Sequence, residues 1–254
     1  MATWRSFWVG FGAEYPCSIE DWQPLRPGHR PADIVPMSTR LILLVAIGLS
    51  GCGGPDPLLV PSAKRLAGAA PDSFDVRVAS SRGPFTIRAR RHWSPFGVDR
   101  FHYLVRHGYY DEARFFRVVG GFVAQWGLSG DPAVNRAWEG RTIPDEPVLA
   151  SNTRGRVSYA RGGPNTRSVQ LYVNFGDNSR LDTLNTFGFP PIGEVIEGME
   201  VVDSLTFEYG GTRTDRKPGP SQDSIRVAGN VYLARDFPRL DWIRKAEITR
   251  TWRR

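Results

Sequence analysis

Residues 115–125 read Phe-Phe-Arg-Val-Val-Gly-Gly-Phe-Val-Ala-Gln, and they say more about the fold of this chain than any other segment. One arginine and one glutamine stand among apolar residues that are typical of a β-strand. Because successive side chains of a strand point to opposite faces, the pattern predicts that Phe115, Arg117 and Val119 share one face. Arg117 is then a charge within an apolar strand. An arginine at a sheet edge that reaches water is the alternative, and a second segment bears on the choice.

Residues 155–173 form that second segment. Two runs rich in strand-forming residues, Arg156–Ala160 and Val169–Val173, flank a cluster of turn-forming residues that contains Gly-Pro-Asn-Thr. The pattern predicts two strands joined by a turn. Together the two segments closely resemble the cyclophilin family of peptidyl-prolyl isomerases. Its hallmarks are a phenylalanine-rich strand with an arginine followed by Gly-Phe, and a strand, a GPNT turn and a glutamine-bearing strand.

Further motifs occur in the order typical of the family, so the resemblance is specific and spans about residues 73–230. They are Val98–Tyr110, Ile143–Glu146, Arg180–Asp182 and Ile192–Asp203. The resemblance implies a mainly β fold: a closed eight-stranded antiparallel barrel, capped by two helices, with a peptide groove on its outside. A closed barrel leaves no free sheet edge, which suits a chain of many short strands.

The same resemblance assigns roles to individual residues. It implies that Arg117 is the catalytic cation and that Gln125 is a second hydrogen-bond donor. It implies a proline pocket formed by Phe122, Val123, Tyr172 and Leu181, and a peptide groove lined by Ala160, Arg161 and Gln170. No covalent step and no cofactor is expected, and proline-containing polypeptides are the expected substrates.

Several positions depart from the family pattern. Phe116 stands where many members have His, Val123 where they have Met, and Tyr172 where they have Phe. Arg180 stands where vertebrate members carry Trp. The following segment, residues 182–192, is longer and lacks the family's pocket-rim His, for which Phe189 is the nearest candidate. We therefore expect an apolar pocket with an altered rim.

Composition agrees with this interpretation. The 254 residues are 41% apolar, with 27 glycines and 20 prolines, which favours one turn-rich β domain with extensions over a helical bundle. The formal net charge is +7. The arginines are dispersed and no zinc-finger spacing, RNP-type motif or long basic block occurs, so we expect no nucleic-acid partner. We also expect a monomeric protein. His102 and His107 are five positions apart, which does not make a same-face metal pair, and we expect no metal site.

The N-terminal region predicts export. Met37–Arg40 precedes nine apolar residues and then Leu49-Ser50-Gly51-Cys52, as in a secretory signal, and this run is too short to span a membrane. The last four residues also resemble the bacterial lipobox, which predicts a signal peptide over residues 37–51 and lipidation of Cys52. Residues 1–36 are then a mis-assigned start or a genuine extension. Residues 52–72 are expected to be a flexible tether.

The remaining elements are less distinctive. Alternation about residues 80–84 predicts a hairpin, and helical spacing from Val98 predicts a helix that stops at Gly108. A short helix is expected over Met199–Leu205 and a flexible loop over residues 210–221. The sequence further suggests a last strand over Ser224–Ala228 and a basic helical tail over residues 231–254, outside the family's usual core.

Three functions are compatible with these patterns. The first is an isomerase that accelerates X-Pro isomerisation during folding of exported proteins. It would be lipid-anchored in a bacterial cell envelope, on an outer membrane and facing the periplasm. The second is a non-catalytic chaperone that binds proline-containing segments in the same groove. The third is a scaffold lipoprotein. The presence of both Arg117 and Gln125 favours the first.

Overall fold

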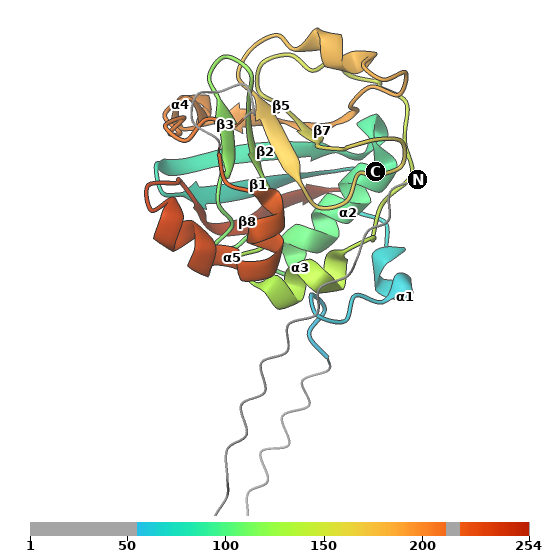
Figure 1. Ribbon diagram of the computed structural model, residues 1–254. Helices are drawn as coiled ribbons and strands as arrows, with labels where there is room; N and C mark the ends of the chain where they lie inside the picture. Colours follow the sequence, from blue (N-terminus) through green and yellow to red (C-terminus); the bar gives the residue numbers. More distant parts are fainter. Residues whose placement is uncertain (1–54, 212–218, 254) are drawn as a thin grey trace, which may run out of the picture. The chain divides into compact units, whose positions relative to one another are not determined.

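The computed structural model describes residues 55–211 and 219–253 (Figure 1). Contacts divide the chain into Met1–Ser50 and Gly51–Arg254, and the described residues all belong to the second unit. The proposed signal peptide and Cys52 lie outside the described residues. Among the helices that are described, none is long and apolar enough to cross a membrane.

Eight antiparallel strands form one sheet that curls into a half-barrel (Figure 1). Their order across the sheet is β3-β4-β6-β5-β7-β2-β1-β8. The strands are β1 (Ser73–Ser80), β2 (Gly83–Arg90), β3 (Arg117–Val119), β4 (Val123–Trp126), β5 (Arg156–Tyr159), β6 (Leu171–Asn174), β7 (Pro191–Glu197) and β8 (Ile243–Trp252). The predicted hairpins are present, since β1 pairs with β2 and β5 pairs with β6.

Closure of the sheet into a complete barrel is not confirmed. The end strands β3 and β8 share no ladder among the described residues; instead, the segments that precede them meet at one isolated bridge between Arg114 and Trp242. Backbone hydrogen bonds beside this bridge join Phe115 to Asp241 and Ile243 to Ala113, both at 2.9 Å. The two sheet ends therefore touch without pairing along the strands.

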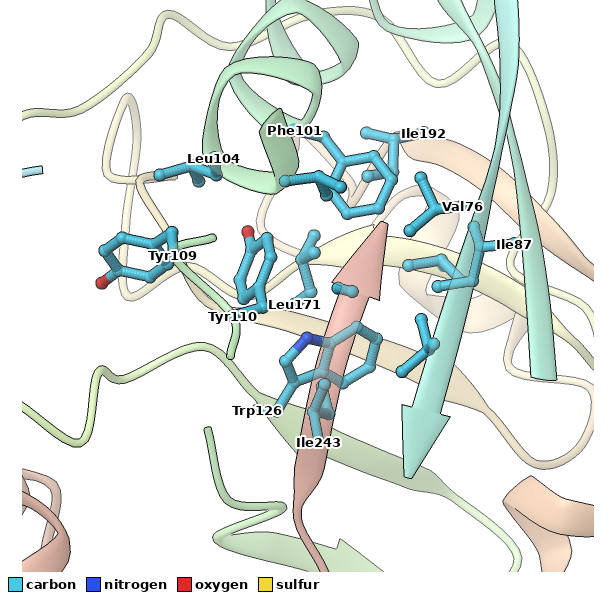
Figure 2. Close-up of a cluster of buried hydrophobic side chains, with 14 of the residues drawn as sticks. Val76, Ile87, Phe101, Leu104, Tyr109, Tyr110, Trp126, Leu171, Ile192 and Ile243 are labelled. Atoms are coloured by element: carbon cyan, nitrogen blue, oxygen red, sulfur yellow. The ribbon is translucent and has the colours of Figure 1, made fainter. Parts of the chain in front are cut away.

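The main core fills the concave side of the sheet beneath helix α2 (Pro95–Arg106). Figure 2 shows Phe101 and Leu104 of this helix facing Trp126 of β4 and Ile243 of β8. The predicted helical spacing is confirmed, because Val98, Phe101 and Leu104 are all fully buried. The helix ends before Gly108, whose φ of 71° is in the left-handed region that glycine tolerates.

More helices accompany the sheet than the two that were expected. They are α1 (Ala63–Leu66), α3 (Pro132–Trp138), α4 (Met199–Asp203) and α5 (Gln222–Asp236), with the 3₁₀ turns η1 (Arg91–Trp93) and η2 (Ser179–Asp182). Of these, α4 had been predicted. Helices α3 and α5 lie side by side (Figure 1).

Residues 115–125 form a hairpin and not one strand. β3 and β4 are joined by a tight turn in which the Phe122 amide donates to the Val119 carbonyl at 3.0 Å, with Gly121 at a φ of 72°. The predicted sharing of a face by Phe115 and Arg117 is wrong. Phe115 lies in the main core, 5.5 Å from the Trp126 ring, whereas Arg117 lies outside, because the strand begins only at Arg117.

The C-terminal predictions also need correction. Residues 224–228 lie within α5, because Ser221 caps the helix by accepting a hydrogen bond from the Ser224 amide at 3.3 Å. The predicted helical tail is wrong beyond Asp236. Its last part is β8, which pairs with β1 and buries Ile243 and Ala246. The tail thus completes the sheet and is part of the domain.

Residues 55–72 are not a free tether, which corrects the prediction for that part of the 52–72 segment. The Trp138 indole donates to the Leu58 carbonyl at 3.0 Å, and the Tyr103 hydroxyl donates to the Pro57 carbonyl at 3.1 Å. The Ala70 amide donates to Asp99 at 2.8 Å. These contacts hold the segment against α2 and α3.

Candidate active site

Three of the candidate site residues, together with Ser158, form a row across four neighbouring strands. Arg117 of β3 is paired with Gln125 of β4, Gln125 with Tyr172 of β6, and Tyr172 with Ser158 of β5. Paired residues of adjacent strands project from the same face of a sheet. Since Ala124 and Trp126 enter the core, Gln125 and the rest of this row project from the opposite, convex face.

Contacts with Gln125, Gly211 and Phe122 orient the Arg117 guanidinium. Its Nη1 donates to Gln125 Oε1 at 3.2 Å, and its Nε donates to the Gly211 carbonyl at 3.0 Å. The guanidinium carbon lies 5.6 Å from the centre of the Phe122 ring. Arg117 is half-buried, and these contacts hold its cation in place.

An apolar cluster that would form the proline pocket lies beside this cation. Val123, Tyr172 and Leu181 form a small cluster that is separate from the main core, and three further side chains pack against it: Phe122, Ala160 and Phe189. The pocket residues come from β4, β6 and η2 and from the ends of β5 and the 182–190 loop. All four residues predicted for the proline pocket are brought together here.

The hydroxyl of Tyr172 does not make the pocket polar. It donates to Asn152 Oδ1 at 3.1 Å, and the same oxygen accepts from the Ser158 hydroxyl at 2.9 Å. Burial is the main cause that raises the pKa of Tyr172. The hydroxyl therefore stays protonated and is directed into a buried polar network, while the ring belongs to the apolar cluster.

The rim of the pocket carries the departures noted in the sequence. The Arg180 guanidinium lies 5.0 Å from the centre of the Phe122 ring, and Phe189 lies 6.2 Å from Tyr172. Two guanidinium groups, those of Arg117 and Arg180, therefore lie near the Phe122 ring. Arg and aromatic rings attract each other at such distances.

The groove continues from the pocket along Ala160, Arg161 and Gln170. These residues line one cavity of about 550 Å³ together with Gln125. Gln125 Nε2 donates to Gln170 Oε1 at 2.8 Å. Arg161 is nearly buried; it donates to Asp145 at 3.2 Å and its guanidinium lies 5.0 Å from the centre of the Phe189 ring.

Sequence reasoning missed the contribution of residues 206–240. Gly211 contacts Arg117, and Gln222 accepts a hydrogen bond from Gln170 Nε2 at 3.1 Å. Phe116, which stands where the resemblance leads one to expect His, is buried in a cluster with Leu128, Ile225, Leu233 and Leu240. No motif marks these contacts. The apolar residue at position 116 was the available signal that another element packs against this part of the chain.

The arrangement offers hydrogen bonding and apolar contact. Arg117 and Gln125 carry hydrogen-bond donors next to a cluster of aromatic and aliphatic side chains. The described residues contain no group of three or more His, Cys, Asp or Glu side chains that could hold a metal.

Comparison with known proteins agrees with the fold. Residues 73–229 match the family model of the cyclophilin type peptidyl-prolyl cis-trans isomerases. A peptidyl-prolyl cis-trans isomerase of Arabidopsis thaliana is 34% identical over 58% of this chain and 86% of its own length. Peptidyl-prolyl cis-trans isomerase B of Escherichia coli is 28% identical over 58% and 92%. The crystal structure of a cyclophilin type isomerase of Cryptosporidium parvum matches with a TM-score of 0.50, 19% identity, and coverage of 70% of this chain and 99% of that one.

The chain therefore belongs to the cyclophilin type family of peptidyl-prolyl cis-trans isomerases. Its relatives are named as isomerases of this kind, which makes it an enzyme of the isomerase class that acts on proline-containing polypeptides. The likeness to the solved structure concerns the fold alone.

Proposed function

We propose that Arg117 accelerates rotation about an X-Pro bond by stabilising the twisted amide. Rotation about a peptide bond has a barrier of ~18–20 kcal/mol because the amide loses its resonance. For an X-Pro bond the barrier is of similar origin, and as the bond twists the prolyl nitrogen becomes pyramidal and regains a lone pair. A guanidinium that donates to this nitrogen binds the twisted state better than either planar isomer, and so lowers the barrier selectively.

The observation that carries this proposal is the position of the Arg117 guanidinium, 5.6 Å from the Phe122 ring at the edge of the apolar pocket. A proline ring packed on Phe122, Val123, Tyr172 and Leu181 would bring its nitrogen to that edge. Gln125 holds the guanidinium from the other side at 3.2 Å. The pocket fixes the ring and excludes water, and Arg117 supplies the charge.

A direct exchange measurement tests this function. The purified full chain should accelerate cis–trans exchange of an Ala-Pro-containing tetrapeptide, followed by NMR without a coupled protease. A non-catalytic binder would shift the peptide resonances and leave the exchange rate at its uncatalysed value. That second result would support the chaperone alternative and contradict the proposal.

We further propose that the enzyme serves exported proteins from a lipid anchor at Cys52. The sequence Leu49-Ser50-Gly51-Cys52 supports this, and Gly53 in place of Asp favours transfer to an outer membrane. Stable attachment needs more than one acyl chain, which modification of a lipobox cysteine supplies. Pro57 and Leu58 already contact α2 and α3, so the domain would stay close to the membrane surface.

Labelling in a bacterial host tests the anchor. Chains expressed from Met37 should enter the detergent phase and incorporate labelled fatty acid, and the Cys52→Ser variant should remain uncleaved and unlabelled. A soluble wild-type protein that keeps residues 37–51 would refute the anchor without affecting the assignment as an isomerase.

A further inference from the structure

A chain of side-chain amides leads away from the catalytic arginine. Arg117 Nη1 donates to Gln125 Oε1 at 3.2 Å, and Gln125 Nε2 donates to Gln170 Oε1 at 2.8 Å. Gln170 Nε2 then donates to Gln222 Oε1 at 3.1 Å. The first three residues come from the sheet or the loop before β6. Gln222 is the first residue of α5.

The direction of this chain is set at both ends. A guanidinium has donors and no acceptor, so Gln125 must present its oxygen to Arg117 and its nitrogen to Gln170. Gln170 must then present its oxygen to Gln125 and its nitrogen to Gln222. An acceptor at position 222 completes the order. Without it, the Gln170 amide can rotate and present its nitrogen to Gln125, where two donors would face each other.

Helix α5 is fixed firmly enough to hold Gln222 in place. Ile225 and Leu233 are buried against Phe116 and Leu128. At the kink in α5, Gly229 has a φ of 54° and approaches Gly130 so closely that a Cβ at position 229 would lie 2.0 Å from the Gly130 carbonyl oxygen. The backbone amide of Asn230 donates to that same oxygen at 2.9 Å. The helix is therefore clamped beside the groove.

Gln222 itself is not needed for this packing. It is half-buried, it lies outside the apolar cluster, and the helix cap is supplied by Ser221. Its side-chain oxygen is directed to Gln170. Asp223 and Arg226 of α5 also line the groove cavity, but Gln222 makes the hydrogen bond to Gln170 that joins the helix to the chain of amides.

We propose that Gln222 is a positioning residue for the isomerisation: it holds Gln170 and Gln125 in the orientation that keeps the Arg117 guanidinium directed at the proline pocket. This inference rests on the proposed role of Arg117. It makes α5, an element outside the motifs recognised in the sequence, a working part of the site.

The test compares three variants of the full chain by NMR exchange and thermal unfolding. Gln222→Leu removes the acceptor and should lower kcat by about threefold to tenfold with KM nearly unchanged, as expected for loss of one net hydrogen bond. Gln222→Glu keeps acceptor oxygens and should retain parental kcat. Val227→Gln, at an exposed position of the same helix, is the matched control and should behave as the parent. All three should unfold at nearly the parental temperature.

Side-chain amide spectra provide a readout that a purely structural role would not change. The Gln125 NH₂ resonances should shift in Gln222→Leu and stay close to their parental positions in Gln222→Glu, whose carboxylate still accepts from Gln170. Parental kcat and unchanged Gln125 resonances in Gln222→Leu would overturn the inference, as would a loss that Glu does not rescue. Arg117→Ala separates the two proposals. If that variant stays active, the catalytic role of Arg117 fails and the inference fails with it; if it is inactive while Gln222→Leu is fully active, only the inference fails.

Discussion

Gly211 gives a way to displace Arg117, the proposed catalytic cation, without removing it. A Cβ built at this position would lie 2.3 Å from Arg117 Cγ and 3.3 Å from its Cδ. Non-bonded carbon atoms normally lie about 3.5–4.0 Å apart, so Arg117 and residue 211 have to separate by more than ~1 Å in a Gly211→Ala variant. The clash is with the middle of the Arg117 side chain, so rotation of the guanidinium end alone cannot relieve it.

Such a displacement should be costly for catalysis. A misplacement of ~1 Å can lower a rate by about 100-fold, so we expect kcat/KM of Gly211→Ala to fall by roughly 10- to 100-fold, or ~1.4–2.7 kcal/mol of transition-state stabilisation. The unfolding temperature should change little, because Arg117 lies outside the main core and on an end strand. Exchange NMR and calorimetry on the same samples measure both quantities.

Gly120→Ala is the matched control. It lies in the turn beside Arg117, and a Cβ there would meet nothing within 4 Å. This variant should keep parental activity. Parental activity in Gly211→Ala, or an equal loss in both variants, would refute the idea that the position of the guanidinium sets the rate.

The other predictions concern the pocket and its surroundings. Phe122→Ala should lower kcat/KM more than tenfold and also destabilise the fold, by about half of the ~3–5 kcal/mol typical of a fully buried aromatic, because Phe122 is half-buried; an unchanged melting temperature would show that the ring is not packed as described. Tyr172→Phe should lose about 1 kcal/mol of stability with its bond to Asn152 and leave kcat nearly unchanged, whereas a large loss of activity would give the hydroxyl a role in the reaction. Burial, aided by the charge of Arg106, lowers the pKa of His102 below 6.5, so the unfolded chain takes up its proton first as the pH falls and stability should decline below about pH 6.5. That decline should be smaller in His102→Gln, and an identical pH profile would exclude His102 as the cause.

The sequence was informative where short motifs have one structural solution. The GPNT turn predicted the β5–β6 hairpin, which is present. Arg117 and Gln125 were assigned to one site, but the hydrogen bond between them was not predicted. That contact follows from the register of β3 and β4, in which Arg117 pairs with Gln125. The register was not predicted because Gly120-Gly121 was taken as part of a strand, whereas it forms the turn. A pair of glycines in an apolar run marks a turn at least as well as a weak strand.

Other elements could not be predicted because their local signals conflict with their tertiary partners. Ser224–Ala228 alternates like a strand, yet the Ser221 cap and burial of Ile225 against Phe116 stabilise a helix. Residues 243–252 contain Lys, Ala and Glu, which favour helix, but pairing with β1 makes them the end strand of the sheet. Gln222 and Gly211 reach the site only through this long-range packing.

The central claim is that the Arg117 guanidinium carries the catalysis, and replacing it tests this most directly. Cis–trans exchange of an Ala-Pro-containing tetrapeptide should be slowed at least ~10-fold in kcat/KM by Arg117→Ala, equivalent to about 1.4 kcal/mol, while the unfolding temperature stays close to that of the parent. An Arg117→Ala variant that is as active as the parent would contradict the account.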